Sequence, residues 1–598
     1  MRSFLLKCMM IASLCVGLLC FGATTAFAAT VNVKPSQGGD AWSAIQAQLN
    51  EAKEKATDAA PVTVKVAAGS YKLSRTLNIY SNTTLDLSGV TLKATSSTAN
   101  MIKVGSTGVD NQRGYAYKNI AIVGGNLDNN GSSNTGIAIG HGKNITLRNL
   151  SVHNTKDAHL VEVAGTDGFT VENCKFYDQT QSKSAKTATP EAIQIDIHVK
   201  KHMKTYRSEA LPMKNIVIKN NTFKNVPRGV GSHTAILNDW VENVEISGNT
   251  FTNCKSGAIQ VLHYKNCRIE GNVINGAPRG IVVYTVNTKG VFFASTAAKE
   301  GGVASKVSSA YIKPASNQNI VVRNNVITLK GSDIYADSEN EGILISGFNF
   351  KSALKKNSAT DAIPKGNYYA SGAVVEGNTI TTTGHGIRLS DARNSVVSNN
   401  KITYVKGGKS GSLYGIQLIN ASTGNTIKGN TVKARTNGIF LTTKSSAKLI
   451  EGNTITSAGK YGIAIEGASA TTITRNTIKK AVTNGIYLLR SSKATTISKN
   501  TITKVTKGSG INIDAKSTAK KITGNTVKSV KLSGIFVHKS SKSSLVSKNK
   551  ITGAKKYGIC VEAKSKISKI TGNTINMKKA KAIKVKSGKS SMSKNKTK

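Results

Sequence analysis

Residues 430–480, NTVKARTNGIFLTTKSSAKLIEGNTITSAGKYGIAIEGASATTITRNTIKK, contain the repeat that decides the fold. An asparagine followed by threonine and an apolar residue begins each repeat, at Asn430, Asn453 and Asn476. A glycine-isoleucine pair follows within the repeat, as at Gly438-Ile439, and both steps between the asparagines are 23 residues. Self-similarity at a fixed period of this length is typical of a solenoid.

The same asparagine continues the repeat in both directions along the chain. It recurs toward the C-terminus at Asn500, Asn525, Asn549 and Asn573, and toward the N-terminus, with some longer steps, at Asn221, Asn249, Asn272, Asn325, Asn378 and Asn400. Between these asparagines, short segments alternate inward Ile or Val with outward polar residues. Stacked coils bury the inward residues in one column, and stacked asparagine side chains can bond along a ladder. The repeat therefore predicts an all-β fold, a single-stranded parallel β-helix.

Residues 1–28 predict a secretory signal peptide. Lys7 belongs to its charged start, residues 8–22 form its apolar run, and Ala26-Phe27-Ala28 is an A-x-A cleavage site. The apolar run is short for a membrane-spanning helix. We therefore expect a secreted protein, extracellular or associated with the cell surface, with no membrane insertion after the signal is cleaved.

The mature chain changes in composition along its length. Residues 29–371 begin with an amphipathic stretch at residues 41–50, which predicts a short capping helix, and they hold long insertions between repeats. Residues 372–585 form regular, lysine-rich repeats, and residues 586–598 form a basic tail. Long loops on a repeat scaffold usually form the walls of a binding site, so we expect the active site in the first portion.

The charge of the chain points to a polyanionic partner. The formal net charge is +51, and residues 351–598 contain only seven acidic residues. Such a charge favours polyanions. No nucleic-acid-binding motif occurs, and aromatic residues do not alternate with the basic ones, so we expect an acidic polysaccharide and no nucleic acid. No feature of the sequence indicates an oligomer, and a monomer is expected.

Outward polar residues of the loop-rich portion are located by aligning the first inward residue of successive coils. The residues taken as equivalent are Val161, Ile193, Ile236, Ile259 and Ile281. On this alignment Asp196 and Asp239 face outward from neighbouring coils, with carboxyl groups on the order of 5 Å apart. Such a pair could serve as acid and nucleophile of a retaining glycosidase, or it could hold a Ca²⁺ ion. Alternatively, the two carboxyl groups could shift each other's pKa without any catalytic role.

The neighbours of this pair complete the candidate site. The candidate catalytic residues are Asp196, Asp239, Glu191, His233 and Arg279. The candidate substrate-binding residues are His159, Glu162, Gln194, Gln260, His263, Tyr284 and Trp240. Arg279 suits a substrate carboxylate, or the proton abstraction of a lyase. His198 and His202 have a spacing found in zinc sites, but no further ligand set is visible and no metal centre is assigned.

Residues 44–47, 62–71 and 77–85 resemble the amino-terminal part of pectin lyase-like proteins, which include polygalacturonase-type glycosidases and pectate lyases. Residues 125–131, GNLDNNG, are similar to a turn that follows in many of them. The resemblance implies a right-handed β-helix and a carbohydrate ligand. The catalytic motifs of polygalacturonases do not occur here in order, so the activity stays open.

Two functions fit these features. The first is a secreted enzyme, a glycoside hydrolase or polysaccharide lyase, with an epimerase as a smaller alternative, that acts on an acidic, uronate-containing glycan. Ca²⁺ is the one cofactor that such a site suggests. The second is a non-catalytic surface or adhesion protein that binds anionic glycans or wall polymers through its lysine-rich repeats.

Overall fold

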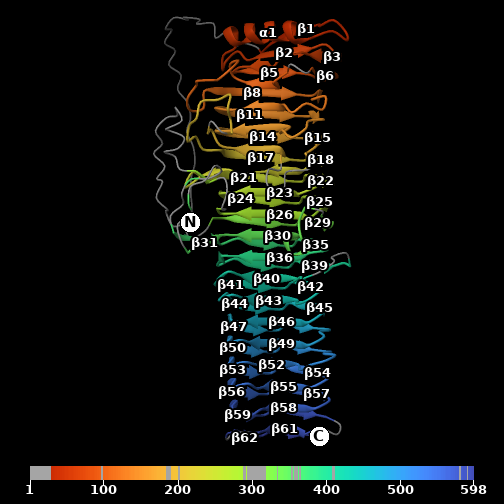
Figure 1. Cartoon of the computed structure of the whole chain (residues 1–598), viewed down its shortest axis with the longest axis vertical. Coiled ribbons are helices and arrows are strands. Elements are labelled where there is room, and N and C mark those ends of the chain that lie inside the picture. The colour runs from red at the N-terminus through yellow and green to blue at the C-terminus, as the bar shows by residue number, and fades with distance from the viewer. Residues whose placement is uncertain are drawn as a thin grey trace, which may run out of the picture.

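The computed structural model describes residues 28–95, 98–182, 190–199, 202–286, 291–292, 318–332, 334–351, 355, 361, 365–406, 411–577, 581–586, 588 and 590–597. These residues form one long right-handed parallel β-helix with a single α-helix, α1 (Trp42–Lys55), at its N-terminal end (Figure 1). The predicted fold is confirmed. The predicted signal peptide lies outside the described residues, except for its last residue, Ala28.

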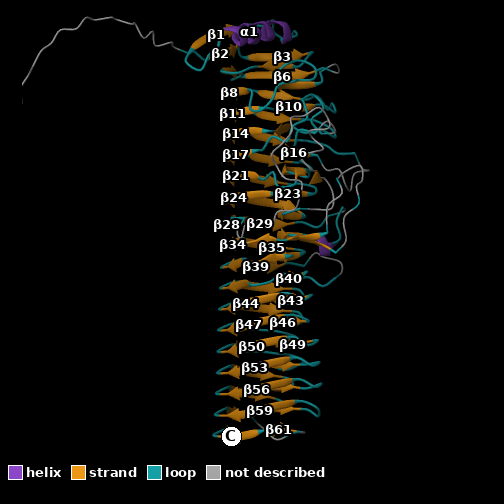
Figure 2. Ribbon diagram, turned by 90° about the vertical axis from the view of Figure 1, so that its left-hand side faces the viewer, coloured by secondary structure: helices purple, strands orange, loops and turns teal. Residues whose placement is uncertain are grey.

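Each coil contributes one strand to each of three parallel sheets, called sheets A, B and C, and the strands of each sheet stack along the axis (Figure 2). Insertions interrupt this order in the N-terminal portion, whereas the coils after residue 411 follow one another closely (Figure 2).

Sheet A consists of β1 (Ala29–Val33), β2 (Val62–Val66), β5 (Thr83–Asp86), β8 (Tyr117–Val123), β11 (Gly142–Arg148), β14 (Thr166–Glu172), β17 (Lys214–Lys219), β21 (Val241–Ser247), β24 (Tyr264–Glu270), β28 (Ile320–Arg323), β34 (Val374–Glu376), β38 (Val396–Ser398), β41 (Asn425–Lys428), β44 (Ser446–Glu451), β47 (Ser469–Thr474), β50 (Lys493–Ser498), β53 (Thr518–Thr523), β56 (Lys542–Ser547), β59 (Lys566–Thr571) and β62 (Ser591–Ser593). Sheet B consists of β3 (Gly69–Leu73), β6 (Val90–Ala94), β9 (Asn126–Asp128), β12 (Ser151–His153), β15 (Lys175–Tyr177), β18 (Thr222–Lys224), β22 (Thr250–Thr252), β25 (Val273–Ala277), β29 (Val326–Leu329), β35 (Thr379–Thr382), β39 (Lys401–Tyr404), β42 (Thr431–Ala434), β45 (Thr454–Ala458), β48 (Thr477–Ile478), β51 (Thr501–Ile502), β54 (Thr526–Val530), β57 (Lys550–Ala554), β60 (Thr574–Asn576) and β63 (Lys596–Thr597). Sheet C consists of β4 (Leu77–Ile79), β7 (Asn100–Val104), β10 (Thr135–Ile139), β13 (Val161–Ala164), β16 (Glu191–Asp196), β19 (Arg228–Gly231), β23 (Gly257–Leu262), β26 (Arg279–Tyr284), β30 (Glu341–Ser346), β36 (His385–Ser390), β40 (Ile416–Ile419), β43 (Ile439–Thr442), β46 (Tyr461–Glu466), β49 (Asn484–Leu489), β52 (Ile511–Ile513), β55 (Ser533–Val537), β58 (Tyr557–Val561) and β61 (Lys581–Val585). The short elements outside these sheets are the pairs β20 (Ala235–Ile236) with β27 (Val291–Phe292), β31 (Phe348–Phe350) with β32 (Gly366–Tyr368), and β33 (Ala370–Ser371) with β37 (Ala392–Arg393), and the 3₁₀ turn η1 (Asp337–Glu339).

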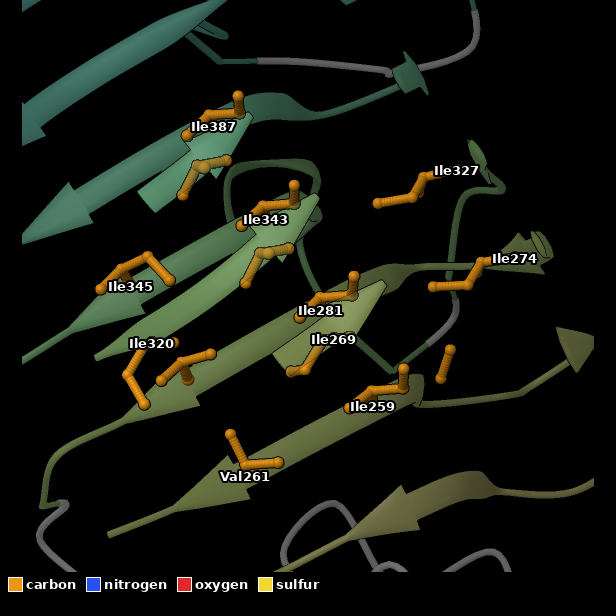
Figure 3. Close-up of a cluster of buried hydrophobic side chains, with 14 of the residues drawn as sticks. Ile259, Val261, Ile269, Ile274, Ile281, Ile320, Ile327, Ile343, Ile345 and Ile387 are labelled. Atoms are coloured by element: carbon orange, nitrogen blue, oxygen red, sulfur yellow. The ribbon is translucent and has the colours of Figure 1, made fainter. Parts of the chain in front are cut away.

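Inward side chains form the core between the three sheets. Ile259, Ile281 and Ile343 pair in register in successive coils of sheet C, and all three are buried (Figure 3). Ile274 and Ile327 form a second column from sheet B (Figure 3). Branched side chains suit these columns because they pack well on a pleated surface.

A ladder of asparagine side chains follows the turn between sheets A and B. In a typical rung, Asn476 Nδ2 donates to Asn500 Oδ1 at 2.9 Å and to Ile450 O of the preceding coil at 2.9 Å. The ladder runs through Asn221, Asn249, Asn272, Asn325, Asn378, Asn400, Asn430, Asn453, Asn476, Asn500, Asn525, Asn549, Asn573 and Asn595. The predicted bonding of stacked asparagines is confirmed, and each turn is thereby fixed against the next.

Helix α1 closes the N-terminal end of the core. Ile45, Leu49 and Ala52 are buried against the first coils, and Gln46 Oε1 accepts a hydrogen bond from Asn78 N at 2.8 Å. The predicted capping helix is confirmed. No helix among the described residues is long and apolar enough to cross a bilayer.

The C-terminal residues continue the same stacking. Strand β62 pairs with β59, and β63 pairs with β60, so part of the predicted basic tail adds strands to sheets A and B. Cys174, Cys254 and Cys267 are free and buried in the core.

Replacing Asn476 with alanine should lower the free energy of unfolding by about 2–4 kcal/mol, because it removes a buried rung and leaves its partners unpaired. Asn476 makes four side-chain hydrogen bonds, two as donor and two as acceptor. Denaturant unfolding and hydrogen exchange of the neighbouring coils measure the effect. Lys480→Ala, at an exposed position nearby, is the matched control. Equal losses in the two variants would show that the ladder is not a special source of stability.

Candidate functional site

Sheet C carries the candidate residues, and one expected coil alignment is wrong. Val161 pairs with Ile193, as expected. The next coil, however, places Val230 beside Ile193, and Val230 in turn pairs with Ile259. Ile236 lies in β20, outside sheet C, where it pairs with β27.

The expected pair of Asp196 and Asp239 is therefore wrong. Strand β19 ends at Gly231, and residues 232–240 form an insertion before sheet A resumes at β21. Asp239 lies in this insertion, whereas Asp196 ends β16 in sheet C. Burial, and then the nearby charge of Glu242, raise the pKa of Asp239 to about 7.

A polar pocket of about 470 Å³ lies over sheet C. It brings together His159, Glu162, Asp196 and His233, four of the predicted site residues. Its other lining residues come from β7, β10 and the neighbouring loops: Ala99, Asn100, Ser133, Asn134, Thr135, Asp157, Ala158, His202 and Lys204. Carboxyl, imidazole and amide groups on one concave surface suit a ligand rich in hydroxyl groups.

Glu162 is the protonated acid of this pocket. It pairs with Gln194 on the neighbouring strand, and Asp196 lies two residues beyond Gln194. The strand spacing and the rise per residue place the Cβ atoms of Glu162 and Asp196 about 8 Å apart. Burial, and then the negative charge of Asp196, raise the pKa of Glu162 to about 8. Such a group holds its proton at neutral pH, so the pocket combines a proton donor with a second carboxyl group.

Glu191 holds the cationic groups of the site. Its Oε1 accepts from Arg228 Nη1 at 2.6 Å and lies 3.2 Å from His233 Nδ1. Its Oε2 lies 3.7 Å from His159 Nδ1. Burial alone would raise the pKa of Glu191, but His233 and Arg228 outweigh burial and lower it to about 2.

The same interaction keeps His233 charged. Burial alone would lower the pKa of His233, but the charge and hydrogen bond of Glu191 raise it to about 9. Glu191 is completely buried, whereas the side chain of His233 is 40% exposed and lines the pocket. Glu191 therefore positions a cation at the pocket wall and does not itself face the ligand.

Asp196 is held in a fixed orientation. Ile197 N donates to its Oδ1 at 2.8 Å, and Thr234 Oγ1 donates to the same atom. His202 Nδ1 lies 3.6 Å from Asp196 Oδ2. Beside it, Gln194 is completely buried, and neither its amide nitrogen nor its oxygen has a hydrogen-bond partner among the described residues. A buried amide of this kind is costly unless it serves a ligand.

Arg279 and Tyr284 lie further along sheet C, in β26. Arg279 Nη2 donates to Tyr284 Oη at 3.1 Å and to Glu341 Oε2 at 3.3 Å. Burial opposes the charge on Arg279, but Tyr284 and Glu341 outweigh it and raise its pKa. This guanidinium is therefore a poor proton acceptor.

The remaining predicted residues pack under the insertion at residues 232–240. Trp240 stacks on His263 with ring centroids 3.8 Å apart, and His263 Nε2 accepts from Asn238 N at 3.0 Å. Burial lowers the pKa of His263 to about 4. Gln260 Nε2 donates to Ser232 O at 3.2 Å. Gln260, His263 and Trp240 thus support the loop that carries His233.

Metal binding has no support in the described part of the chain. No group of three His, Cys, Asp or Glu side chains there is arranged to hold a metal ion. His198 is buried against His141, with ring centroids 4.3 Å apart.

An arginine and a lysine of the site, Arg228 and Lys204, were not predicted. Arg228 precedes Gly229-Val230 as Arg279 precedes Gly280-Ile281, and this repeated pattern is the signal that locates it. Lys204 lies in an insertion, where the repeat gives no register.

Glu191→Gln should lower the pKa of His233 from about 9, because it removes the carboxylate that raises this pKa most and leaves burial and Arg228 opposed by Asp196 alone. Histidine titration by NMR measures the change. His153, stacked on Tyr177 in sheet B, is the internal control and should titrate as in the wild type. An unchanged His233 titration would contradict the anchoring role of Glu191.

Several known proteins are similar to this chain. Plasmin and fibronectin-binding protein A of Streptococcus pneumoniae (strain ATCC BAA-255 / R6) is 23% identical over 188 residues, which are 30% of this chain and 25% of the relative. The match thus spans about a quarter of the relative's length.

Solved structures that are similar to this chain include PfbA, a surface adhesin of Streptococcus pneumoniae, at 15% identity over 78% of this chain and 93% of that chain, with a TM-score of 0.41. The tailspike protein of E. coli bacteriophage HK620, in complex with a pentasaccharide, matches at 14% identity over 81% of this chain and 75% of that chain, with a TM-score of 0.46. The sequence model described as "Right handed beta helix region" matches residues 74–274, 301–449 and 414–575. The chain belongs to this right-handed β-helix family.

Proposed function

We propose that the protein is an extracellular glycoside hydrolase that cleaves a polysaccharide in the sheet C pocket. The observation that supports this most is the polar pocket over sheet C, which brings the carboxyl groups of Glu162 and Asp196 together. Burial and the charge of Asp196 raise the pKa of Glu162. A protonated carboxyl group beside a second carboxyl group is the arrangement that glycoside hydrolysis requires.

In this mechanism Glu162 is the general acid and Asp196 is the general base. Glu162 donates its proton to the glycosidic oxygen as the bond from that oxygen to the anomeric carbon breaks. Asp196 accepts a proton from a water molecule whose oxygen forms the new bond to the anomeric carbon. A water molecule between the two carboxyl groups requires them to lie roughly 6.5–9.5 Å apart, and hydrolysis then inverts the anomeric carbon.

Hydrolysis fits the site better than elimination. A lyase requires a base that removes the proton next to a uronate, and Arg279 was the predicted base. Its contacts with Tyr284 and Glu341 favour the protonated guanidinium, which opposes that role. Chelator treatment should therefore leave the activity unchanged, and no unsaturated product should absorb in the ultraviolet.

An acidic glycan is the proposed substrate class. The net charge of +51 attracts polyanions. Within the pocket, Lys204 and the charged His233 supply cations.

A second function, retention on an anionic polymer, is favoured by the lysines of sheet A. Lys493, Lys542 and Lys566 lie in one column with Thr518, and all three lysines are exposed. Coils about 4.8 Å apart thus present a row of cations to a linear polyanion. The pneumococcal relative is named for plasmin and fibronectin binding, which agrees with a surface-binding role.

Glu162→Gln should lower kcat by roughly 10²–10⁴-fold with little change in KM, because it removes the proton donor and keeps the shape of the side chain. In the wild type, the rate should fall as the pH rises through about 8, where Glu162 loses its proton. Reducing-end release from a polysaccharide panel, and NMR of the anomeric product, measure both. Asp239→Asn is the matched control and should keep its activity. Loss of activity in that control with full activity in Glu162→Gln would refute the assignment.

Replacing Lys493, Lys542 and Lys566 together with alanine should weaken binding to polygalacturonate by roughly threefold or more at low salt. Because exposed charges are screened, the difference should vanish near 1 M salt, where the Debye length is about 3 Å. Glu162→Gln should bind as tightly as the wild type. Binding that does not respond to salt would argue against retention by these lysines.

A further inference from the structure

The aromatic residues of the regular repeats all gather on one face. Residues 411–597 contain six of them, Tyr414, Phe440, Tyr461, Tyr487, Phe536 and Tyr557. Five lie in strands of sheet C, and Tyr414 lies two residues before β40 of the same sheet. The strands of sheets A and B in these coils carry threonine, serine and lysine at their outward positions and no aromatic ring.

These rings have no place in the core. Outward positions of sheet C form a register column through Gln417, Phe440, Ala464, Tyr487, Asn512 and Phe536. The inward neighbours Ile439 and Leu441 already fill the core and are completely buried. The rings therefore cover the outer surface of sheet C, where the fold does not require them.

The rings form a partly exposed platform. Tyr414 and Phe440 have ring centroids 4.7 Å apart, and so do Tyr461 and Tyr487. Tyr414, Tyr461, Phe536 and Tyr557 each keep part of their surface exposed. A row of ring faces along a flat sheet suits the apolar faces of pyranose rings.

Hydrogen-bonding groups accompany the rings. Tyr487 Oη donates to Asp514 Oδ2 at 2.5 Å, and His538 Nε2 lies 3.0 Å from Asn512 Oδ1. Gln417 Oε1 is buried and accepts no hydrogen bond from the described residues, and Asp514 Oδ1 lies 3.6 Å from both His538 Nε2 and Lys539 Nζ. Carboxyl, imidazole and amide groups on an outer face can exchange hydrogen bonds with sugar hydroxyls.

The platform is collinear with the pocket. The column that begins at Glu162 and Gln194 passes through Gln260 and Arg388 and reaches Gln417 and Phe440 without leaving sheet C. Coils repeat about every 4.8 Å, which is close to the length of one pyranose unit in an extended chain. One polysaccharide can therefore follow the sheet from the pocket to the platform.

We propose that the outward face of sheet C over residues 414–557 is a second glycan-binding site, which stacks the sugar rings of an extended polysaccharide on Tyr461, Phe536 and their neighbours. This proposal rests on the proposed function only for the identity of the polysaccharide, because the same polysaccharide would occupy the pocket. Its chemistry differs from that of the lysine face, because it recognises ring faces and hydroxyl groups and not charge.

The test is affinity electrophoresis of the full-length protein in gels that contain xylan, glucomannan, hydroxyethyl cellulose or polygalacturonate. Tyr461→Ala with Phe536→Ala should raise the Kd for a retarding polymer about two- to tenfold per lost ring, also at high salt. Tyr461→Phe with Phe536→Tyr should bind like the wild type, because the rings remain. Leu449→Ala with Leu545→Ala removes two partly exposed apolar side chains from sheet A and is the matched control.

The outcomes separate this site from the hydrolase. If a polymer retards the wild type and the loss of the rings weakens this retardation, the platform is supported. This holds even if Glu162→Gln keeps full hydrolytic activity. Unchanged retardation of the ring variant, an equal loss in the leucine control, or no retardation of the wild type by any of the four polymers would overturn it.

Discussion

Every surface feature of this protein depends on the hydrogen-bond register between successive coils. The asparagine ladder fixes each turn against the next through buried amide groups, as between Asn476 and Asn500. Because parallel strands then stack in register, each outward position becomes a column along the axis, and a slip of one residue would turn that column inward. The pocket and the aromatic platform lie along one such face of sheet C, and the lysine row lies along sheet A.

The insertions decide where an outward column becomes the proposed catalytic site. In the N-terminal portion, loops place His202 and His233 over sheet C and partly bury Glu162. The pKa of Glu162 is raised because its environment disfavours the charged carboxylate. The fold does not need a carboxyl group in such an environment. The repeats after residue 411 lack such loops, so their outward columns stay open to long, linear ligands.

Much of this could be predicted from the sequence, and the limits have a physical origin. The period of 23 to 25 residues predicted the parallel coils, the asparagine ladder and the core columns, because all three follow from local repetition. His159, Glu162, Asp196 and His233 were predicted and do meet in one pocket. Asp239 was misplaced because the alignment took Ile236, fifteen residues after Asn221, although Val230 has the nine-residue spacing that separates Asn430 from Ile439. The pairing of Arg279 with Glu341 spans 62 residues and an insertion, and no local pattern encodes it.

The proposed hydrolysis requires a carboxyl group of sheet C that stays protonated at neutral pH beside a second carboxyl group. The most direct test is the titration of Glu162 itself, by ¹³C-NMR of the selectively labelled side-chain carboxyl, in the wild type and in Asp196→Asn. The structure predicts a midpoint near pH 8 in the wild type and a lower one in the variant, because the charge of Asp196 contributes to the shift. A midpoint near the ordinary value of 4.5 in both proteins would show that Glu162 is ionised at neutral pH, and it would contradict the role of Glu162 as the general acid.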